Sequence, residues 1–137
     1  MSNNEGIRHR IRELRDFATR KGVMKYEERI LFEPLLTDVG MMSEIYDMVF
    51  ALDLDIYAKR SIFYFVVIYY YSPRKLIGIK CPKNVFARMR ELVGESSSLV
   101  AHGCNNIAYW YLLNNKYHPY VDSVMNRINA MIDEKTK

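Results

Sequence analysis

The sequence predicts an all-α domain of five to seven helices, and three observations lead to this fold class. Apolar residues recur at helical spacing in several segments of the 137-residue chain. Hydrophobic residues make up 50% of the chain, which is enough for a packed core and argues against disorder. No repeat, low-complexity stretch or Gly/Ser-rich linker interrupts the sequence, so residues 1–137 are expected to form a single domain.

The first 22 residues predict a basic amphipathic helix. Between Glu5 and Lys21, apolar side chains fall on one helical stripe, which consists of Ile7, Ile11, Leu14 and the pair Phe17/Ala18. Five arginines occupy the remaining surface, and Gly22 is a natural end for the helix. Such a helix could dock on the core, contact a partner or lie along nucleic acid.

Two further helices are expected in the next part of the chain. Between Met24 and Val39 the pattern predicts a short helix that breaks near Pro34. Ser43 then resembles the N-cap of a helix that continues to about Leu52. The residues expected to face inward on that second helix are Ile45, Val49 and Leu52.

The longest apolar run predicts a buried central helix. Asp55 is its expected N-cap, and the pattern continues to about Tyr71 and becomes apolar all round after Arg60. A β-strand is the competing interpretation, because Phe63–Tyr71 is rich in β-branched and aromatic residues. The length of the pattern favours a helix, which Ser72-Pro73 would end. The apolar run is far shorter than the roughly 20 residues that a membrane span needs.

The C-terminal half predicts a basic loop followed by three helices. The loop spans Arg74–Lys83, and a short helix follows over Asn84–Val93. Gly94 breaks this helix, and the Ser96–Ser98 cluster can cap the next one. The last helix starts at Tyr117-His118-Pro119, with the proline in its first turn. Its apolar stripe consists of Val121, Val124/Met125, Ile128 and Met131/Ile132.

Charge is divided unevenly along the chain. Residues 1–25 carry seven Lys/Arg against three acids, residues 26–58 one against eight, residues 59–93 eight against one, and residues 94–137 four of each. The basic 59–93 block leads directly into the serine-rich turn, as expected of a phosphate-binding surface. The alternative is that these are ordinary solvated charges, or that the acidic block pairs with the basic ones within the fold or between subunits.

Residues 84–115 are therefore a candidate helix-turn-helix, the motif that delivers side chains to the DNA major groove. On a second helix that starts at Ser97, the core-facing residues would be Val100, Gly103, Cys104, Ile107 and Tyr111. The predicted base-reading residues on the opposite face and at the helix start are Ser97, Ser98, His102 and Asn105. The predicted phosphate contacts are Arg74, Lys75, Lys80, Lys83, Arg88, Arg90 and Ser96. A capped helix with solvent-facing polar residues is the alternative.

The order of these elements resembles that of the C-terminal DNA-binding domain of the bacterial replication initiator DnaA, and it is similar to Trp-repressor-type helix-turn-helix domains. The resemblance covers residues 55–132. In the DnaA family the turn carries Asp-His-Ser-Thr and two apolar residues, where this chain has Glu95-Ser96-Ser97-Ser98-Leu99-Val100. The resemblance implies that Ser97 and Ser98 contact DNA and that the basic loop contacts phosphates.

The chain also departs from these domains at several positions. The histidine that is distinctive of the DnaA turn is replaced by Ser96, and His102 matches no family residue without a shift. Arg90 lies four residues before the glycine, where helix-turn-helix proteins usually carry a small residue that lets the helices pack closely. No nucleotide-binding motif precedes the domain, so the resemblance implies a class of domain and not an initiator ATPase.

No catalytic or metal-binding pattern is expected. The three histidines are scattered, and the two cysteines, Cys81 and Cys104, have no partner at metal-ligand spacing. A reduced, intracellular pair of cysteines is favoured over a single disulfide. No glycine-rich phosphate loop or nucleophile elbow occurs. We therefore expect no enzyme, no metal, no cofactor and no small-molecule substrate.

The leading hypothesis is a non-enzymatic regulator from a bacterium, a phage or a mobile element. Its expected partner is double-stranded DNA, which it would bind as a homodimer, because one helix offers few base contacts. The polar start of the chain lacks a secretory signal, so a cytoplasmic location without membrane contact is expected. The rival hypothesis is a helical structural or interaction component, such as a phage assembly or virion protein. The eight methionines and many aromatic residues of the chain suit partner surfaces as well as a core.

Overall fold

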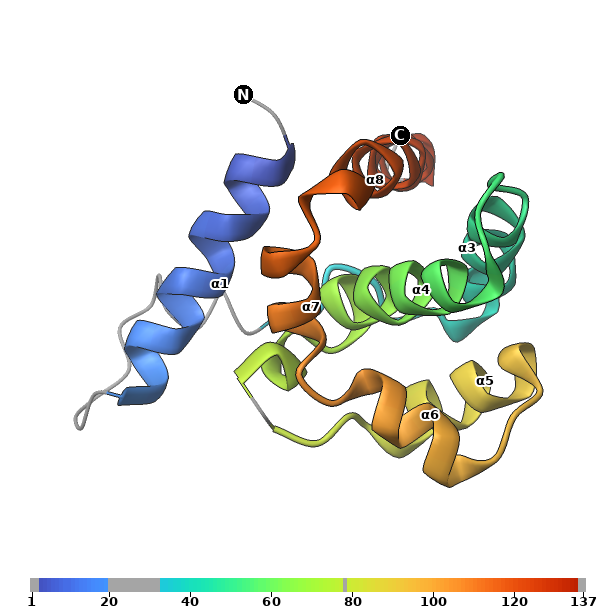
Figure 1. The fold of residues 1–137 in the computed structure, drawn as a ribbon, viewed down its shortest axis with the longest axis horizontal. Coiled ribbons are helices and arrows are strands. Elements are labelled where there is room, and N and C mark those ends of the chain that lie inside the picture. The colour runs from blue at the N-terminus through green and yellow to red at the C-terminus, as the bar shows by residue number, and fades with distance from the viewer. Residues whose placement is uncertain (1–2, 20–32, 78, 136–137) are drawn as a thin grey trace.

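The computed structural model describes residues 3–19, 33–77 and 79–135, and these residues form helices joined by short turns (Figure 1). The described part contains seven α-helices and no strand, which confirms the predicted all-α class. The α-helices are α1 (Asn3–Thr19), α3 (Met42–Phe50), α4 (Ile56–Tyr71), α5 (Lys83–Val93), α6 (Ser97–Cys104), α7 (Ile107–Leu113) and α8 (His118–Lys135). Three short 3-10 helices accompany them: η1 (Val39–Met41), η2 (Pro73–Ile77) and η3 (Asn115–Tyr117). None of the described helices is long and apolar enough to cross a membrane.

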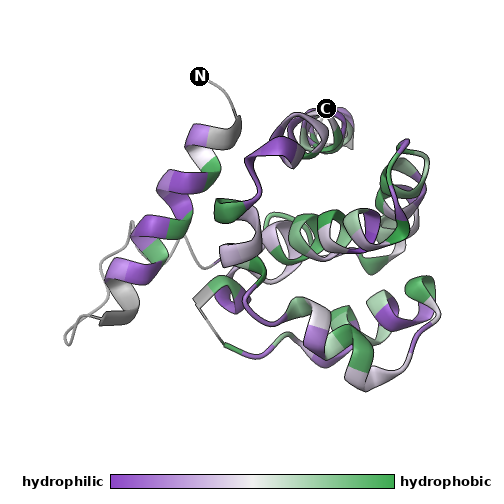
Figure 2. Ribbon diagram, viewed as in Figure 1, coloured by the Kyte–Doolittle hydropathy of each residue, from purple (hydrophilic) through white to green (hydrophobic). Residues whose placement is uncertain are grey.

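Helix α4 lies at the centre of the fold. It contacts α3, α5, α6, α7 and α8, and Figure 2 shows its mostly apolar surface enclosed by these neighbours. Asp55 caps its start, because a side-chain oxygen accepts a hydrogen bond from the Ala58 amide at 2.9 Å. Every residue from Ile62 to Ile68 is buried, as expected for a helix that is apolar on all sides. The predicted helix, cap and stop at Ser72-Pro73 are therefore confirmed over the β-strand alternative.

Helix α1 packs against the core through the predicted stripe. Ile7, Ile11 and Leu14 are buried, whereas the side chains of Phe17 and Ala18 and the expected stop at Gly22 lie outside the described residues. Arg10 is only 8% exposed; its guanidinium donates to the Tyr69 carbonyl at 3.3 Å and lies over the Tyr69 ring. The positive charge of Arg10 at the C-terminal end of α4 also interacts favourably with the helix dipole. One arginine of the basic helix thus fixes α1 to the core.

The segment before α4 differs from the predictions for the helix near Pro34 and for the N-cap at Ser43. The helix predicted near Pro34 falls largely outside the described residues, and the described residues 33–38 are not helical. Ser43 is not an N-cap, because η1 leads directly into α3 and places Ser43 inside the helix, where its hydroxyl donates to the Gly40 carbonyl at 3.2 Å. Asp38 caps η1 instead, with a side-chain oxygen that accepts from the Gly40 amide at 2.9 Å. Of the three residues predicted to face inward, Ile45 and Val49 are buried on α3, whereas Leu52 follows the end of the helix and is half-buried against the core.

The consecutive tyrosines at the end of α4 belong to the core. The Tyr70 hydroxyl donates to the Asn129 side chain at 2.6 Å, and the Tyr71 hydroxyl donates to the Asp38 carbonyl at 2.6 Å. Burial raises the pKa of both phenols above the ordinary tyrosine value, so both remain protonated donors. These two hydrogen bonds tie α4 to α8 and to the segment before α3.

Candidate nucleic-acid interface

The turn between α5 and α6 has the geometry that the glycine and serines predict. Gly94 adopts φ +74°, a left-handed conformation that ends α5, and its amide donates to the Arg90 carbonyl at 2.8 Å. The Ser96 hydroxyl accepts from the Leu99 amide at 3.2 Å and so caps α6. Between them, Glu95 forms a 2.6 Å ion pair with Arg60 of α4. The turn is thus fixed to the central helix as well as to its own two helices.

Helix α6 lies close to α4 and α5 on its inner face. Val100 and Cys104 are buried, and the Cys104 thiol approaches the Met89 sulfur of α5 at 3.6 Å. Gly103 faces Tyr64 of α4, and a Cβ built on this glycine would lie 2.5 Å from the Tyr64 ring. A side chain at position 103 would therefore push α6 away from the core.

The second helix is shorter than the sequence predicts. It ends at Cys104, because Asn105 is extended and Asn106 adopts φ +60°, a left-handed conformation that asparagine tolerates well. Ile107 and Tyr111, which were expected on the core face of α6, belong to the separate helix α7, where both are buried. Tyr109 is also on α7. It is 54% exposed, and the Arg15 guanidinium lies over one face of its ring. The polar row of α6 therefore extends over two turns only.

The four predicted base-reading residues are all exposed. Ser97 and Ser98 form the start of α6, and His102 lies one turn further along the same helix. Asn105 is not on the helix face as predicted, since it follows the last helical residue. Its side-chain oxygen accepts a 3.4 Å hydrogen bond from the Lys75 ammonium. The structure thus brings three of the four residues together on α6 and places the fourth at its end.

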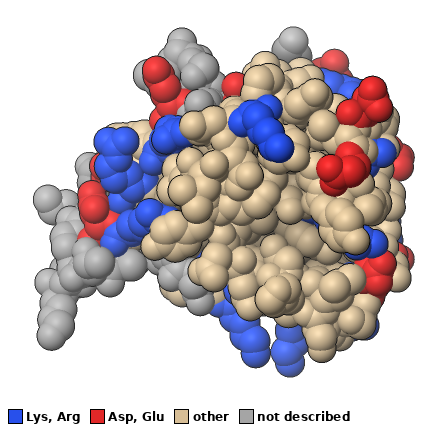
Figure 3. All heavy atoms as spheres, viewed as in Figure 1, with Lys and Arg blue, Asp and Glu red and all other residues tan. Residues whose placement is uncertain are grey.

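The predicted phosphate contacts differ in their exposure and in the contacts that they make within the fold. Lys80, Lys83, Arg74 and Arg90 are exposed, and Arg90 therefore does not separate α5 from α6. Lys75 is half-buried beside Asn105. The remaining two candidates have local contacts: Arg88 pairs with Glu91 at 2.6 Å, and the Ser96 hydroxyl caps α6. Figure 3 shows cationic side chains projecting at the lower edge of the molecule, where residues 79–82 and α5 lie.

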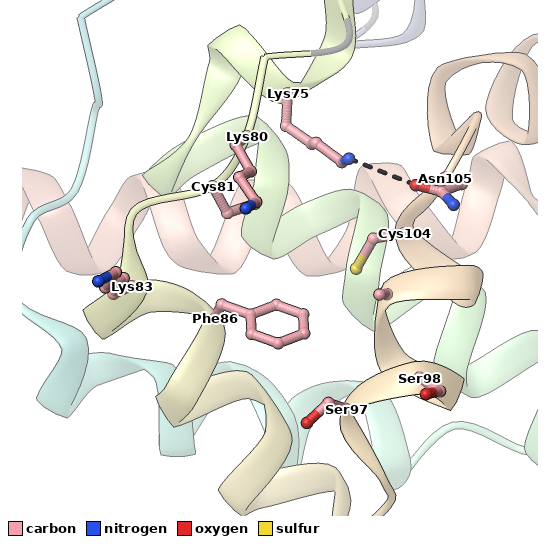
Figure 4. A pocket seen from close by; sticks show the side chains of 10 residues that line it. Lys75, Lys80, Cys81, Lys83, Phe86, Ser97, Ser98, Cys104 and Asn105 are labelled. Atoms are coloured by element: carbon pink, nitrogen blue, oxygen red, sulfur yellow. Dashed lines mark hydrogen bonds between the residues drawn. The ribbon is translucent and has the colours of Figure 1, made fainter.

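A pocket of about 580 Å³ separates the outer parts of α5 and α6, and the sequence did not indicate it. Figure 4 shows the Phe86 ring projecting from α5 into this space, opposite Ser97 and Cys104 of α6. Phe86 is half-buried and lies three residues before the buried Met89 on the same helix. The pocket is lined by side chains from η2, from residues 80–81, from α5 and from α6, with Asn105 at the end of α6.

The two cysteines line this pocket, and both carry free thiols. Burial is the main cause that raises the pKa of Cys104 to about 12, and burial also raises the pKa of Cys81. Both thiols are therefore protonated near neutral pH, a state in which cysteine is a poor nucleophile. Within the described ranges, no three His, Cys, Asp or Glu side chains gather into a group that could hold a metal ion.

Comparisons with known proteins assign the chain to no family. No family model matches the chain, and no curated protein or solved structure is significantly similar to it. The surface of α5, α6 and the segment that precedes them is therefore the basis for a functional proposal.

Proposed function

We propose that this chain is a non-enzymatic protein that binds double-stranded DNA through α5, the Gly94–Ser96 turn and α6. The observation that carries the proposal is the exposed polar side chains of α6, Ser97, Ser98 and His102. The exposed Lys80 and Lys83 line the same pocket as the two serines. An α-helix of eight residues is about 12 Å long, comparable to the width of the major groove. Helix α6 could therefore present its first turn to base edges.

The contacts would divide by chemistry. Serine hydroxyls can bond to bases or to phosphates, and His102 can donate to either kind of acceptor. The exposed Lys80, Lys83 and Arg90 would neutralise phosphates on both sides of the groove. Arg88 would contribute less, because Glu91 already pairs with it. The resemblance to helix-turn-helix domains supports the same division, and a regulator of bacterial, phage or mobile-element origin remains the proposed biological role.

The dependence of affinity on salt tests this proposal directly. Fluorescence anisotropy with a random duplex should show a steep fall in affinity as salt rises, by about 0.9 log units per decade of salt for each phosphate neutralised. The variant Lys83→Ala/Arg90→Ala should flatten that slope by roughly one unit per cation. The matched control is Lys116→Ala/Arg127→Ala, which removes two exposed cations on the opposite side, at η3 and α8 (Figure 1). This control should leave the slope close to that of the wild type.

Two outcomes would contradict the proposal. One is the absence of binding even at roughly 50 mM salt, where a protein that contacts several phosphates should bind strongly. The other is an equal loss of affinity in both double variants, which would indicate nonspecific attraction to net charge.

If a specific site emerges from selection among random duplexes, Ser98→Ala should weaken binding to that site by about 1–3 kcal/mol, the usual discrimination from a good contact between a side chain and a base. Its effect on random DNA should be much smaller.

The exposed apolar residues of α7 favour a protein contact, and we propose that they join two copies of the chain. Leu113 is 78% exposed and Tyr109 is 54% exposed, four residues apart on one face of the helix. Light scattering after gel filtration should then give the mass of a homodimer, and Leu113→Glu should give a monomer. A wild-type monomer would contradict this part of the proposal. A dimer that binds no DNA would instead favour a structural or interaction role.

A further inference from the structure

We infer that the pocket between α5 and α6 binds a single nucleotide unit, with its base against Phe86 and its phosphate at the lysine rim. This inference goes beyond duplex binding, because a base can enter the pocket only when it is unstacked. The nucleotide could be free in solution or part of a single strand. The same lining residues would recognise it in both cases, so two different probes are needed to separate the sources.

The lysines at the rim of the pocket suit an anionic ligand. Among the described residues that line the pocket, three are lysines, Lys75, Lys80 and Lys83, and none is acidic. Lys75 comes from η2, Lys80 from the segment before α5 and Lys83 from the start of α5 (Figure 4). The three cations come from separate parts of the chain, and Figure 4 shows Lys75 and Lys80 at the upper end of the space and Lys83 at its side, next to the start of α5. A phosphate group of a nucleotide would be attracted there.

The apolar interior of the pocket suits a flat aromatic ligand group. Phe86 is half-buried, and its ring lies in the middle of the space between the two helices (Figure 4). Cys81, Cys104 and Ala101 provide further apolar surface around it. Stacking of a base on an aromatic side chain is a common source of affinity for single strands and tolerates any base. Inorganic phosphate alone would leave this apolar surface uncovered.

The α6 side of the pocket offers hydrogen bonds to the edge of a base. Ser97, Ser98 and Asn105 line that side, and Figure 4 shows the Asn105 amide directed toward Lys75 at the upper end. Hydroxyl and amide groups can both donate and accept, so they fit the mixed edge of a nucleobase. A purely aliphatic anion would use the lysines and Phe86 but not these polar groups. The volume of about 580 Å³ lies in the range of ordinary small-molecule sites.

Calorimetric titration with adenosine monophosphate, and anisotropy with a short oligodeoxyadenylate strand, would test the inference. Phe86→Leu should weaken binding roughly tenfold or more, because it removes the aromatic face while keeping an apolar side chain. Phe50→Leu is the matched control, since Phe50 is also half-buried but lies on α3, outside the pocket. Ala101→Leu should also abolish binding by filling the space, and it removes no polar group. Thermal unfolding of each variant establishes that it is folded.

The outcomes separate this inference from the proposed function. Binding of both probes, or of either one alone, with loss in Phe86→Leu and Ala101→Leu, supports the nucleotide site and identifies the source of the nucleotide. Binding that these two variants leave unchanged, or equal binding of inorganic phosphate, overturns it. If the duplex of the oligodeoxyadenylate strand with its complement binds while neither probe does, the inferred nucleotide site is wrong and the proposed duplex binding stands. If none of the nucleic acids binds, both fail.

Discussion

Replacing Tyr111 by alanine is expected to lower the free energy of unfolding by about 3–5 kcal/mol, the usual cost of truncating a large aromatic residue in a core. Tyr111 of α7 is fully buried between two other rings. Its ring stacks on Phe65 of α4 at a centroid distance of 4.4 Å and on His118 of α8 at 4.1 Å. One side chain therefore connects three helices, and its removal affects all of their packing.

A hydrogen bond reinforces the same column of rings. The His118 Nε2 atom lies 2.7 Å from the Tyr111 carbonyl, so the backbone at position 111 also fixes the start of α8. Alanine keeps that carbonyl, but it leaves a cavity beside Phe65 and His118 that can collapse only partly. A typical domain is stable by about 5–15 kcal/mol, so this variant should lose a large part of its stability.

Urea unfolding followed by circular dichroism would measure the change, and Tyr57→Ala is the matched control. Tyr57 lies in the first turn of α4, outside the column of rings, and is 75% exposed. Its truncation should change the free energy of unfolding by about 0.5 kcal/mol or less, as is usual for surface substitutions. Similar destabilisation in both variants would mean that the ring column does not join the three helices.

The helices of the core could be predicted because their patterns are long and consistent. The segment from Ile56 to Tyr71 is continuously apolar after Arg60, has a capping aspartate before it and a proline after it, and the structure follows all three indications. The end of α6 could not be predicted in this way. Val100, Cys104, Ile107 and Tyr111 keep helical spacing across Asn105-Asn106, although the helix breaks there. Each side chain is buried in either arrangement, so periodicity alone does not distinguish one helix from two.

The exposed residues of the candidate interface could be predicted because the polar face of an amphipathic helix lies opposite its core-facing residues and is exposed to solvent. Ser97, Ser98 and His102 follow that rule. The pocket could not be found, because its lining residues come from η2, residues 80–81, α5 and α6, which are adjacent only in the tertiary fold. Lys75 and Asn105 are 30 positions apart in sequence, and only the tertiary fold brings their side chains together. Local patterns carry no information about such distances.

Replacing Gly103 by alanine is expected to destabilise the protein, whereas the same change at Gly6 is expected to stabilise it. Both glycines lie within helices, where alanine is intrinsically favoured by about 0.8–1 kcal/mol. A Cβ at Gly6 would meet no atom within 4 Å, so Gly6→Ala should gain most of this amount. A Cβ at Gly103 would lie 2.5 Å from the Tyr64 ring, and overpacking of this kind costs about 1–3 kcal/mol.

The opposite signs make this pair a sensitive test of how α6 lies on α4. Tyr64 is 3% exposed, and its hydroxyl has no hydrogen-bond partner among the described residues. Tyr64→Leu therefore removes the ring without breaking a hydrogen bond of that hydroxyl. In the double variant Gly103→Ala/Tyr64→Leu, the penalty of the alanine should largely disappear, and a double-mutant cycle on urea unfolding would measure this coupling. If Gly103→Ala instead stabilised the protein as Gly6→Ala does, α6 would not be in tight contact with the central helix. The orientation of its exposed polar row, on which the proposed interface depends, would then have to be different.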